Sequence, residues 1–175
     1  MNTINADNCL FLMIDIQEKL VKMLYENETK TNCIKLAKTA NILNIPTVIT
    51  EQYPKGLGET VPEIKKILLN AQYIEKTSFS ACEEIKHLLN KKQIILFGIE
   101  THICVLQTAF DLINNGYEVF IVKCACGSRN QDNKITALER MHQAGMQIVT
   151  TEMVIFELLK SSKHPNFKEI QAIIK

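Results

Sequence analysis

Three side chains that could carry out acyl chemistry together lie at or just after the ends of predicted strands. Asp15 closes the apolar run LFLMID, Lys76 ends the segment QYIEK, and Cys104 lies in GIETHICV, shortly after a further apolar run. A buried aspartate is costly without a partner, which the lysine could supply. A cysteine in the first turn of a helix is favoured as a thiolate. The three residues predict either a nucleophile, a carboxylate and a cation in one site, or a structural ion pair beside an inert cysteine.

The elements that must position these residues follow an alternating pattern. Short runs rich in Ile and Val alternate with longer stretches of helical periodicity, which is typical of parallel strands joined by crossover helices. Most runs are apolar at consecutive positions, as expected of strands covered on both faces, and such sheets bind ligands beyond the carboxyl ends of their strands. The predicted strands are Cys9 to Asp15, Pro46 to Glu51, Gln72 to Lys76, Gln93 to Gly98, Glu118 to Lys123 and Gln147 to Thr151.

Helical periodicity and capping residues place the helices between these strands. Ser80 and Glu83 form a capping-box pattern, and Gly116 and Gly145 stand where helix C-caps belong. The tail is expected to form one or two helices, broken near His164 and Pro165. A segment rich in Gly and Pro, Gln52 to Pro62, is expected to be a surface loop beside the site. The predicted helices are Thr31 to Asn44, Glu63 to Asn70, Ser80 to Leu89, Thr101 to Asn115, Asn130 to Ala144 and Glu152 to Lys175.

Length and composition narrow the function classes. With 175 residues, the chain is expected to form one domain over residues 1–175. A net charge of +1 gives no basic surplus for nucleic acid or anionic membranes, and every apolar run is far shorter than a membrane span. The N-terminus lacks the pattern of a secretory signal. Six irregularly spaced cysteines are read as reduced thiols. We therefore expect a cytoplasmic protein with no nucleic-acid or membrane partner.

Three segments resemble the signatures of the isochorismatase-like cysteine hydrolases. They are MIDIQ at 13–17, EKTSFSA at 75–81 and GIETHICV at 98–105. The segments TEQYPKGLG at 50–58 and HPNFKEIQ at 164–171 are similar to the subgroup called isochorismatase domain-containing proteins. The resemblance extends over nearly the whole chain. It implies a triad of Asp15, Lys76 and Cys104, and we expect a three-layer α/β/α domain with a doubly wound, mainly parallel six-stranded sheet in the order 3-2-1-4-5-6.

The resemblance also implies a reaction. In this family a non-proline cis peptide precedes the nucleophile, which here would be Ile99 to Glu100, with the N–H of Cys104 and that of Thr101 or a neighbour as oxyanion donors. The substrate would be a small amide or a related acyl C–N compound, hydrolysed through a thioester on the cysteine. Related nicotinamidases hold a metal after the second strand, where this chain has Thr50 to Tyr53 without those ligands. No metal or other cofactor is therefore expected, and relatives of this kind are usually homo-oligomers.

Four further residues are candidates for substrate binding. Gln17 could hydrogen-bond near the site or merely start the first helix, and Tyr53 and Phe79 could line the pocket. Arg129 could bind a substrate carboxylate through its guanidinium, or it could belong to a structural turn after the fifth strand. His102 is not expected to form a dyad with the cysteine two residues later, because residues i and i+2 of a helix point in different directions.

Two alternatives to an amidase remain open at this point. The chain could be a catalytically silent interaction module that keeps the fold. It could also be a redox-sensing thiol protein that uses Cys104, or the pair Cys124 and Cys126, for reversible oxidation.

Overall fold

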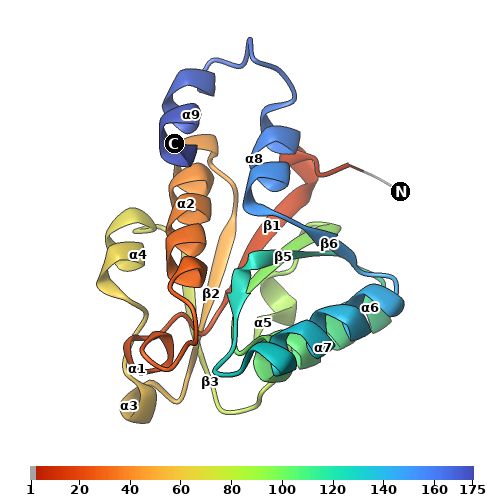
Figure 1. Cartoon of the computed structure of the whole chain (residues 1–175). Coiled ribbons are helices and arrows are strands. Elements are labelled where there is room, and N and C mark those ends of the chain that lie inside the picture. The colour runs from red at the N-terminus through yellow and green to blue at the C-terminus, as the bar shows by residue number, and fades with distance from the viewer. Residues whose placement is uncertain (1–2) are drawn as a thin grey trace.

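Six parallel strands form the sheet at the centre of the computed structural model, which describes residues 3–175 (Figure 1). Their spatial order is β3-β2-β1-β4-β5-β6, and each neighbouring pair is parallel. The predicted order and the three-layer α/β/α architecture are confirmed. The strands are β1 (Cys9–Ile14), β2 (Thr47–Gln52), β3 (Gln72–Lys76), β4 (Gln93–Ile99), β5 (Glu118–Gly127) and β6 (Gln147–Val149).

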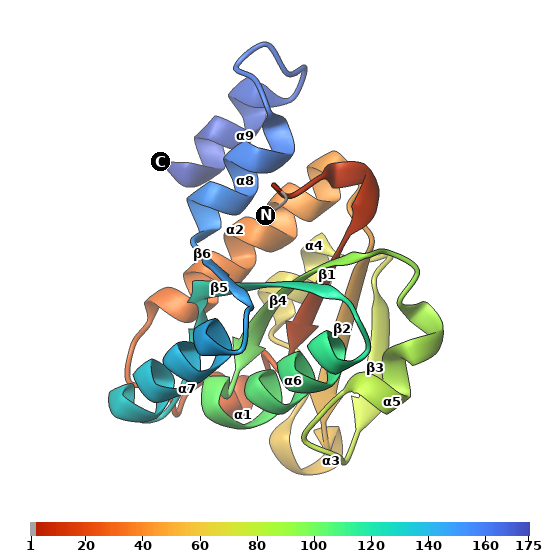
Figure 2. The ribbon, with the colours of Figure 1, turned by 90° about the vertical axis from the view of Figure 1, so that its right-hand side faces the viewer.

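The helices cover the two faces of the sheet in separate groups (Figure 2). On one face α2 contacts α4, α8 and α9, while on the other α6 contacts α5 and α7. The short helices α1 and α3 contact each other beyond the carboxyl ends of β1 and β2. The helices are α1 (Glu18–Val21), α2 (Glu28–Leu43), α3 (Pro54–Leu57), α4 (Pro62–Ile67), α5 (Cys82–Ile85), α6 (Leu106–Asn114), α7 (Gln131–Gln143), α8 (Thr151–Leu159) and α9 (Phe167–Ile174).

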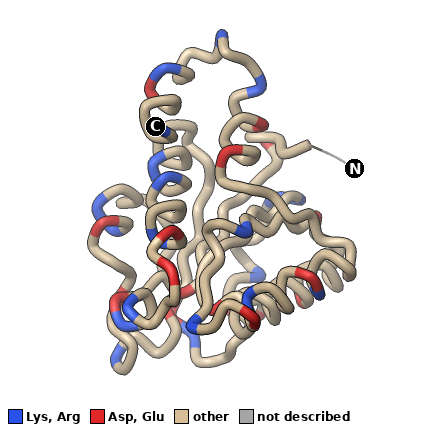
Figure 3. Tube along the Cα trace, viewed as in Figure 1, with Lys and Arg blue, Asp and Glu red and all other residues tan. Residues whose placement is uncertain are grey.

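The core lies along the two central strands. Every residue of β1 and β4 is buried, because helices cover both faces of the sheet there. Phe11 and Phe97, on these neighbouring strands, pack edge to face with their ring centroids 5.8 Å apart. Over residues 3–175, every helix is too short or too polar to cross a membrane. Figure 3 shows basic and acidic residues interspersed over the outer helices, in keeping with the net charge of +1.

Several predicted boundaries near the site were wrong. The predicted helix from Thr101 begins instead as a π-helical turn, Thr101–Val105, and becomes α6 at Leu106. β5 continues past Lys123 to Gly127, because its pairing with β4 resumes after a register shift. At the other end of the sheet, β6 stops at Val149, since Thr150 caps α8 through its side chain.

Two predicted local structures are also corrected. The capping box at Ser80 does not form: its hydroxyl donates to Asp111 Oδ2 at 2.5 Å, while Glu83 pairs with the exposed Lys86. The helix expected there is reduced to α5 and a 3-10 turn over residues 86–88. The segment 52–62, expected to be a loop, contains the short helix α3. The predicted break of the tail is confirmed, since α8 and α9 are separate helices on either side of Pro165.

A glycine allows β4 to approach β1 closely just before the nucleophile turn. Gly98 has a φ of +137°, and a Cβ atom on it would lie 2.0 Å from the carbonyl oxygen of Ile14. Both the backbone conformation and the space therefore exclude a side chain. Because Ile14 directly precedes Asp15, this close approach brings the end of β1 next to the segment that carries Cys104.

We expect Gly98→Ala to lower the free energy of unfolding by about 3 kcal/mol, since the clash is with backbone and cannot be relieved by a rotamer change. Gly116→Ala is the matched control. Gly116 also has a positive φ, +82°, but its nearest neighbour would be Lys92 Nζ at 3.9 Å. That substitution should cost only about 1–2 kcal/mol, the backbone penalty alone. Urea unfolding of the two variants measures both values, and equal losses would show that the contact with Ile14 relaxes freely.

Candidate active site

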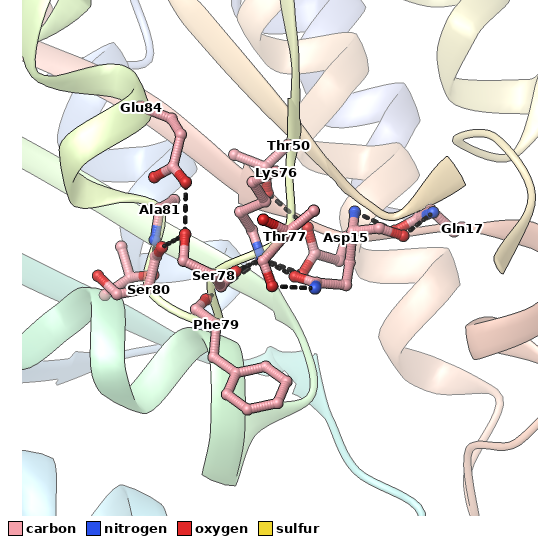
Figure 4. A network of polar contacts seen from close by, with 12 residues as sticks. Asp15, Gln17, Thr50, Lys76, Thr77, Ser78, Phe79, Ser80, Ala81 and Glu84 are labelled. Atoms are coloured by element: carbon pink, nitrogen blue, oxygen red, sulfur yellow. Dashed lines mark hydrogen bonds and ion pairs between the residues drawn. The ribbon is translucent and has the colours of Figure 1, made fainter. Parts of the chain in front are cut away.

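Asp15 is the first residue after β1 and is fully buried. Its φ of +52° is rare for a residue with a side chain, and the backbone is held on both sides, by Asp15 N–H donating to Thr50 O at 3.1 Å and Gln17 N–H donating to Asp15 O at 2.8 Å. Both carboxylate oxygens have partners (Figure 4). Oδ1 accepts from the Thr50 hydroxyl at 2.6 Å, and Oδ2 accepts from Lys76 Nζ at 2.8 Å.

Lys76 ends β3 and is buried to the same degree, so the ion pair with Asp15 has no exposed side-chain surface. Its ammonium is surrounded by four oxygens. Besides Asp15 Oδ2 these are Gln52 Oε1 at 2.6 Å and the carbonyls of Ser78 and Phe79, both at 3.2 Å. An ammonium group has three N–H donors, so these acceptors use all of them. Lys76 can therefore act on the site through its charge and by holding Asp15, but not by donating a proton to a bound molecule.

Cys104 lies in the π-helical turn that follows β4. The peptide bond between Ile99 and Glu100, at the start of this turn, is cis, the configuration that the family resemblance implies. The carbonyl of Glu100 accepts from the N–H groups of both Ile103, at 3.1 Å, and Val105, at 3.2 Å. The turn carries the cysteine side chain to the buried edge of the sheet, where it is only 7% exposed.

The surroundings of Cys104 favour its protonated form. Burial and the neighbouring Asp15 carboxylate, through its charge and a hydrogen bond, raise the pKa of the thiol to about 12, although Lys76 and the backbone of Glu100 act in the opposite direction. The position at the start of a helix favours a thiolate, whereas burial and the Asp15 carboxylate act against it. A thiol in this form stands next to a carboxylate that can accept its proton.

Glu100 and Arg129 join the nucleophile turn to the end of β5. The Arg129 Nε lies 2.8 Å from Glu100 Oε1, and the Arg129 backbone N–H donates to Glu100 Oε2 at 3.2 Å. Glu100 is 8% exposed and holds both contacts. Of the two roles left open for Arg129, these bonds support the structural one, because its guanidinium is already paired with a carboxylate.

The next two residues of the turn are attached to the same segment. The Thr101 hydroxyl donates to Gly127 O at 2.9 Å, and His102 Nδ1 lies 3.1 Å from Ser128 Oγ. Thr101 is fully buried, so its side chain anchors the turn. His102 faces Ser128 rather than Cys104, in agreement with the prediction that the two do not form a dyad.

The remaining candidates lie at different depths. Gln17 is fully buried, and its amide donates to Gln52 O at 3.0 Å and to Gly58 O at 2.6 Å, so it fixes the segment that carries α3. Tyr53 and Phe79 are 56% and 53% exposed and could meet a ligand from outside. Tyr53 borders a hollow of about 470 Å³ whose other lining residues are Pro54, Lys55, Glu75, Lys76, Thr77 and Glu84.

Two polar partners of the ion pair, Thr50 and Gln52, are not among the residues that the sequence predicts for the site. In the sequence they stand out only as part of the stretch where related nicotinamidases hold a metal. Their spacing could have identified them, because alternate residues of a strand share a face. Both lie near the end of β2, the strand between those that lead to Asp15 and Lys76. Across residues 3–175, no cluster of three or more His, Cys, Asp or Glu side chains is arranged to hold a metal ion.

The other cysteines do not form a second reactive site of the same kind. All six thiols are free. Burial is the main cause of the raised pKa of Cys33 and Cys126, and Cys33 Sγ donates to Ala125 O at 3.4 Å. Cys124 Sγ accepts from the Thr151 N–H at 3.1 Å at the start of α8. Cys104 is thus distinguished by its neighbouring carboxylate and cation.

Comparison with known proteins agrees with the fold. A family model described as the isochorismatase domain matches residues 9–153. Isochorismatase domain-containing protein 2 of Danio rerio is 41% identical over 177 residues, covering 98% of this chain and 89% of that protein. The solved structure of a MAR1 ribonuclease from Caenorhabditis elegans superposes with a TM-score of 0.95 and 42% identity, covering 99% of this chain and 92% of the other. The YcaC gene product of Escherichia coli, described as an octameric hydrolase of unknown specificity, has a TM-score of 0.88 and 27% identity, with coverage of 97% and 95%.

The family model and the zebrafish relative both extend over most of the chain. The chain therefore belongs to the isochorismatase domain family.

Proposed function

We propose that this protein is a metal-independent cysteine hydrolase that cleaves a small amide or a related acyl C–N substrate. The observation that carries the proposal is the Cys104 thiol beside the Asp15 carboxylate, which is itself held in a fully buried ion pair with Lys76. This arrangement supplies a nucleophile, an adjacent proton acceptor and a fixed positive charge.

In the proposed reaction Asp15 accepts the thiol proton as the Cys104 sulfur attacks the acyl carbon. The oxyanion is stabilised by the N–H of Cys104, with that of Thr101 as the second donor; each such donor contributes about 3–4 kcal/mol. When the C–N bond breaks, Asp15 returns the proton to the departing nitrogen, which leaves as an amine or ammonia. The remaining thioester is hydrolysed by a water that gives its proton to Asp15, and the proton then returns to the thiol as the acid leaves.

The buried ion pair suits this division of roles. The three N–H donors of the Lys76 ammonium are all used in hydrogen bonds to oxygens of the protein. It therefore stabilises the negative charge that moves between Asp15, Cys104 and the oxyanion, without itself exchanging a proton. Burial raises the pKa of the Cys104 thiol to about 12, which favours the neutral thiol at pH 7 and limits side reactions.

RNA cleavage is a second candidate because the nematode structure is described as a ribonuclease. The net charge of +1 and the interspersed surface charges favour a small substrate over a polyanion (Figure 3). The thiol nucleophile also suits an acyl carbon better than a phosphodiester. Incubating a labelled single-stranded RNA with wild type and with Cys104→Ala distinguishes the amidase from the ribonuclease. RNA cleavage that survives the substitution would favour the ribonuclease.

The proposal has three further parts. The chain forms a single domain over residues 1–175, it is cytoplasmic, and it assembles as a homo-oligomer. The E. coli neighbour is described as octameric, and α8 of this chain presents Met153 and Phe156 with 46% and 44% of their surfaces exposed. Exposed apolar side chains on one helix suit contact between copies. Sedimentation equilibrium decides the point, because a mass of one chain, 19.9 kDa, would refute it.

Site-resolved alkylation by iodoacetamide tests the proton transfer without a known substrate. At pH 7 we expect Cys104 to react at least about tenfold more slowly in Asp15→Asn than in wild type, because the variant cannot take the thiol proton. If Asp15 acted through its charge alone, its removal would lower the pKa of the thiol and speed the reaction. A faster Asp15→Asn variant would therefore contradict the proposal.

Cys82 provides the matched control for this measurement. Burial and then the charge of Asp111 raise its pKa to about 11, so Asp111→Asn should speed the alkylation of Cys82. The same substitution should leave the rate at Cys104 unchanged, since Asp111 is not among the groups that shift its pKa.

A further inference from the structure

Two side chains from β2 reach the triad although no motif marks them as catalytic. β2 lies between β1, which leads to Asp15, and β3, which ends at Lys76. Thr50 pairs in register with Ile14, and Gln52 pairs with Lys76. Alternate residues of a strand point to the same face. Both side chains accordingly reach the ion pair from the strand between its two members, Thr50 at Asp15 (Figure 4) and Gln52 at Lys76.

Thr50 contacts Asp15 at two points. Its hydroxyl lies 2.6 Å from Asp15 Oδ1, and its carbonyl accepts the Asp15 N–H at 3.1 Å. Both residues are fully buried. An ionised carboxylate only accepts hydrogen bonds, so the hydroxyl must donate, and together with Lys76 on Oδ2 it fixes the rotation of the carboxylate.

Gln52 performs a comparable function for Lys76. Its Oε1 accepts from Lys76 Nζ at 2.6 Å, and its Nε2 donates to Thr77 O at 2.8 Å. Its backbone N–H donates to Gln17 Oε1 at 2.7 Å. A neutral amide can hold the ammonium without competing for its charge, so the electrostatic attraction of Lys76 remains directed to Asp15.

We infer that Thr50 and Gln52 are positioning residues of the triad: Thr50 orients the Asp15 carboxylate as proton acceptor, and Gln52 holds the Lys76 ammonium in place beside it. Both act through the triad rather than on reacting atoms. The inference rests on the proposed function, because the orientation of Asp15 affects the reaction only if Asp15 takes the proton of Cys104.

Thr50→Val removes the hydroxyl and keeps the shape of the side chain. We expect the rate of Cys104 alkylation at pH 7 to fall about tenfold, and kcat on any substrate found to fall similarly while KM changes little, since a misplaced catalytic group affects the reaction more than binding. Thr50→Ser should restore most of both rates. Thr47→Val is the matched control, because Thr47 is buried on the same strand and its hydroxyl donates to Ile45 O at 3.0 Å, away from the triad.

Gln52→Glu tests the second half of the inference. The substitution places another carboxylate beside the Lys76 ammonium, where it should draw the ammonium from Asp15 and slow Cys104 alkylation about tenfold. An unchanged rate in Gln52→Glu would remove Gln52 from the inference.

The outcomes separate this inference from the function on which it depends. If wild-type Cys104 reacts no faster than in Asp15→Asn, both fail. If that difference is present but Thr50→Val behaves like Thr47→Val, only the role of Thr50 is overturned. Urea unfolding shows whether Thr50→Val folds. If it does not, Thr50→Ser, which keeps the hydroxyl donor, takes its place. A rate of Cys104 alkylation in Thr50→Ser as low as in Asp15→Asn would overturn the inference.

Discussion

Cys104→Ala should reduce hydrolysis of any amide or ester accepted by the wild type by a factor of about 10³ or more. The substitution removes the sulfur that forms the covalent intermediate, and the loss of a nucleophile that works as part of a unit is among the largest effects seen in such enzymes. A panel of small amides and esters, screened by release of amine or alcohol, measures the effect. Mass spectrometry of the peptide that contains Cys104 should show the acyl adduct with a slowly hydrolysed substrate.

Cys82→Ala is the control for this prediction. Cys82 has the same exposure as Cys104, 7%, and its pKa is likewise raised by burial, to about 11. It has no ion pair like that of Asp15 and Lys76 next to it, so its removal should leave turnover within about twofold of wild type. Turnover that survives in Cys104→Ala, or an adduct on Cys82 instead, would refute the proposed mechanism.

The strands and the polar residues at their carboxyl ends could be predicted from short-range patterns, whereas the triad was predicted from the family resemblance. Apolar runs of consecutive residues identify strands that are covered on both faces, and polar residues at their carboxyl ends mark the edge where sites form. Asp15 and Lys76 satisfy that pattern directly, since they end the first and third predicted strands. Their contact then follows from the strand order, because only β2 separates the two strands.

The local structure around Cys104 could not be predicted in this way. The helical pattern from Thr101 is the same for a π turn and an α-helix at this length. The π turn is held by contacts with Gly127, the last residue of β5, and with Ser128, which follows it. The raised pKa of the Cys104 thiol could not be predicted from the sequence either. It depends on burial and on the distance to Asp15, both of which are set by tertiary packing.

The role of Arg129 illustrates a further limit. A guanidinium at the ligand-binding edge of a sheet suits a carboxylate, and the sequence does not distinguish a carboxylate of the substrate from one of the protein. The structure pairs Arg129 with Glu100, which forms the cis peptide bond with Ile99. The same side chain thus stabilises the turn on which the nucleophile stands.

The second large effect that we predict is on stability, and it follows from the buried ion pair of Asp15 and Lys76. Replacing Lys76 by Met should lower the free energy of unfolding by about 3–5 kcal/mol, because it leaves the Asp15 carboxylate buried without its cation. The pair itself is not expected to contribute that much, since the desolvation of two charges offsets most of their attraction. Asp15→Asn combined with Lys76→Met should therefore recover a large part of the loss.

Lys65→Met is the matched control, because Lys65 also pairs with a carboxylate, Glu59, at 2.7 Å, but with 40% and 70% of the two side chains exposed. It should cost less than about 1 kcal/mol. Urea unfolding of the four proteins at pH 7 measures the differences. A loss in Lys76→Met no larger than in Lys65→Met would show that Asp15 finds water or another donor when Lys76 is removed. The Asp15 carboxylate would then stay ionised without Lys76. The role of the Lys76 cation would then lie in the reaction and not in the stability of the fold.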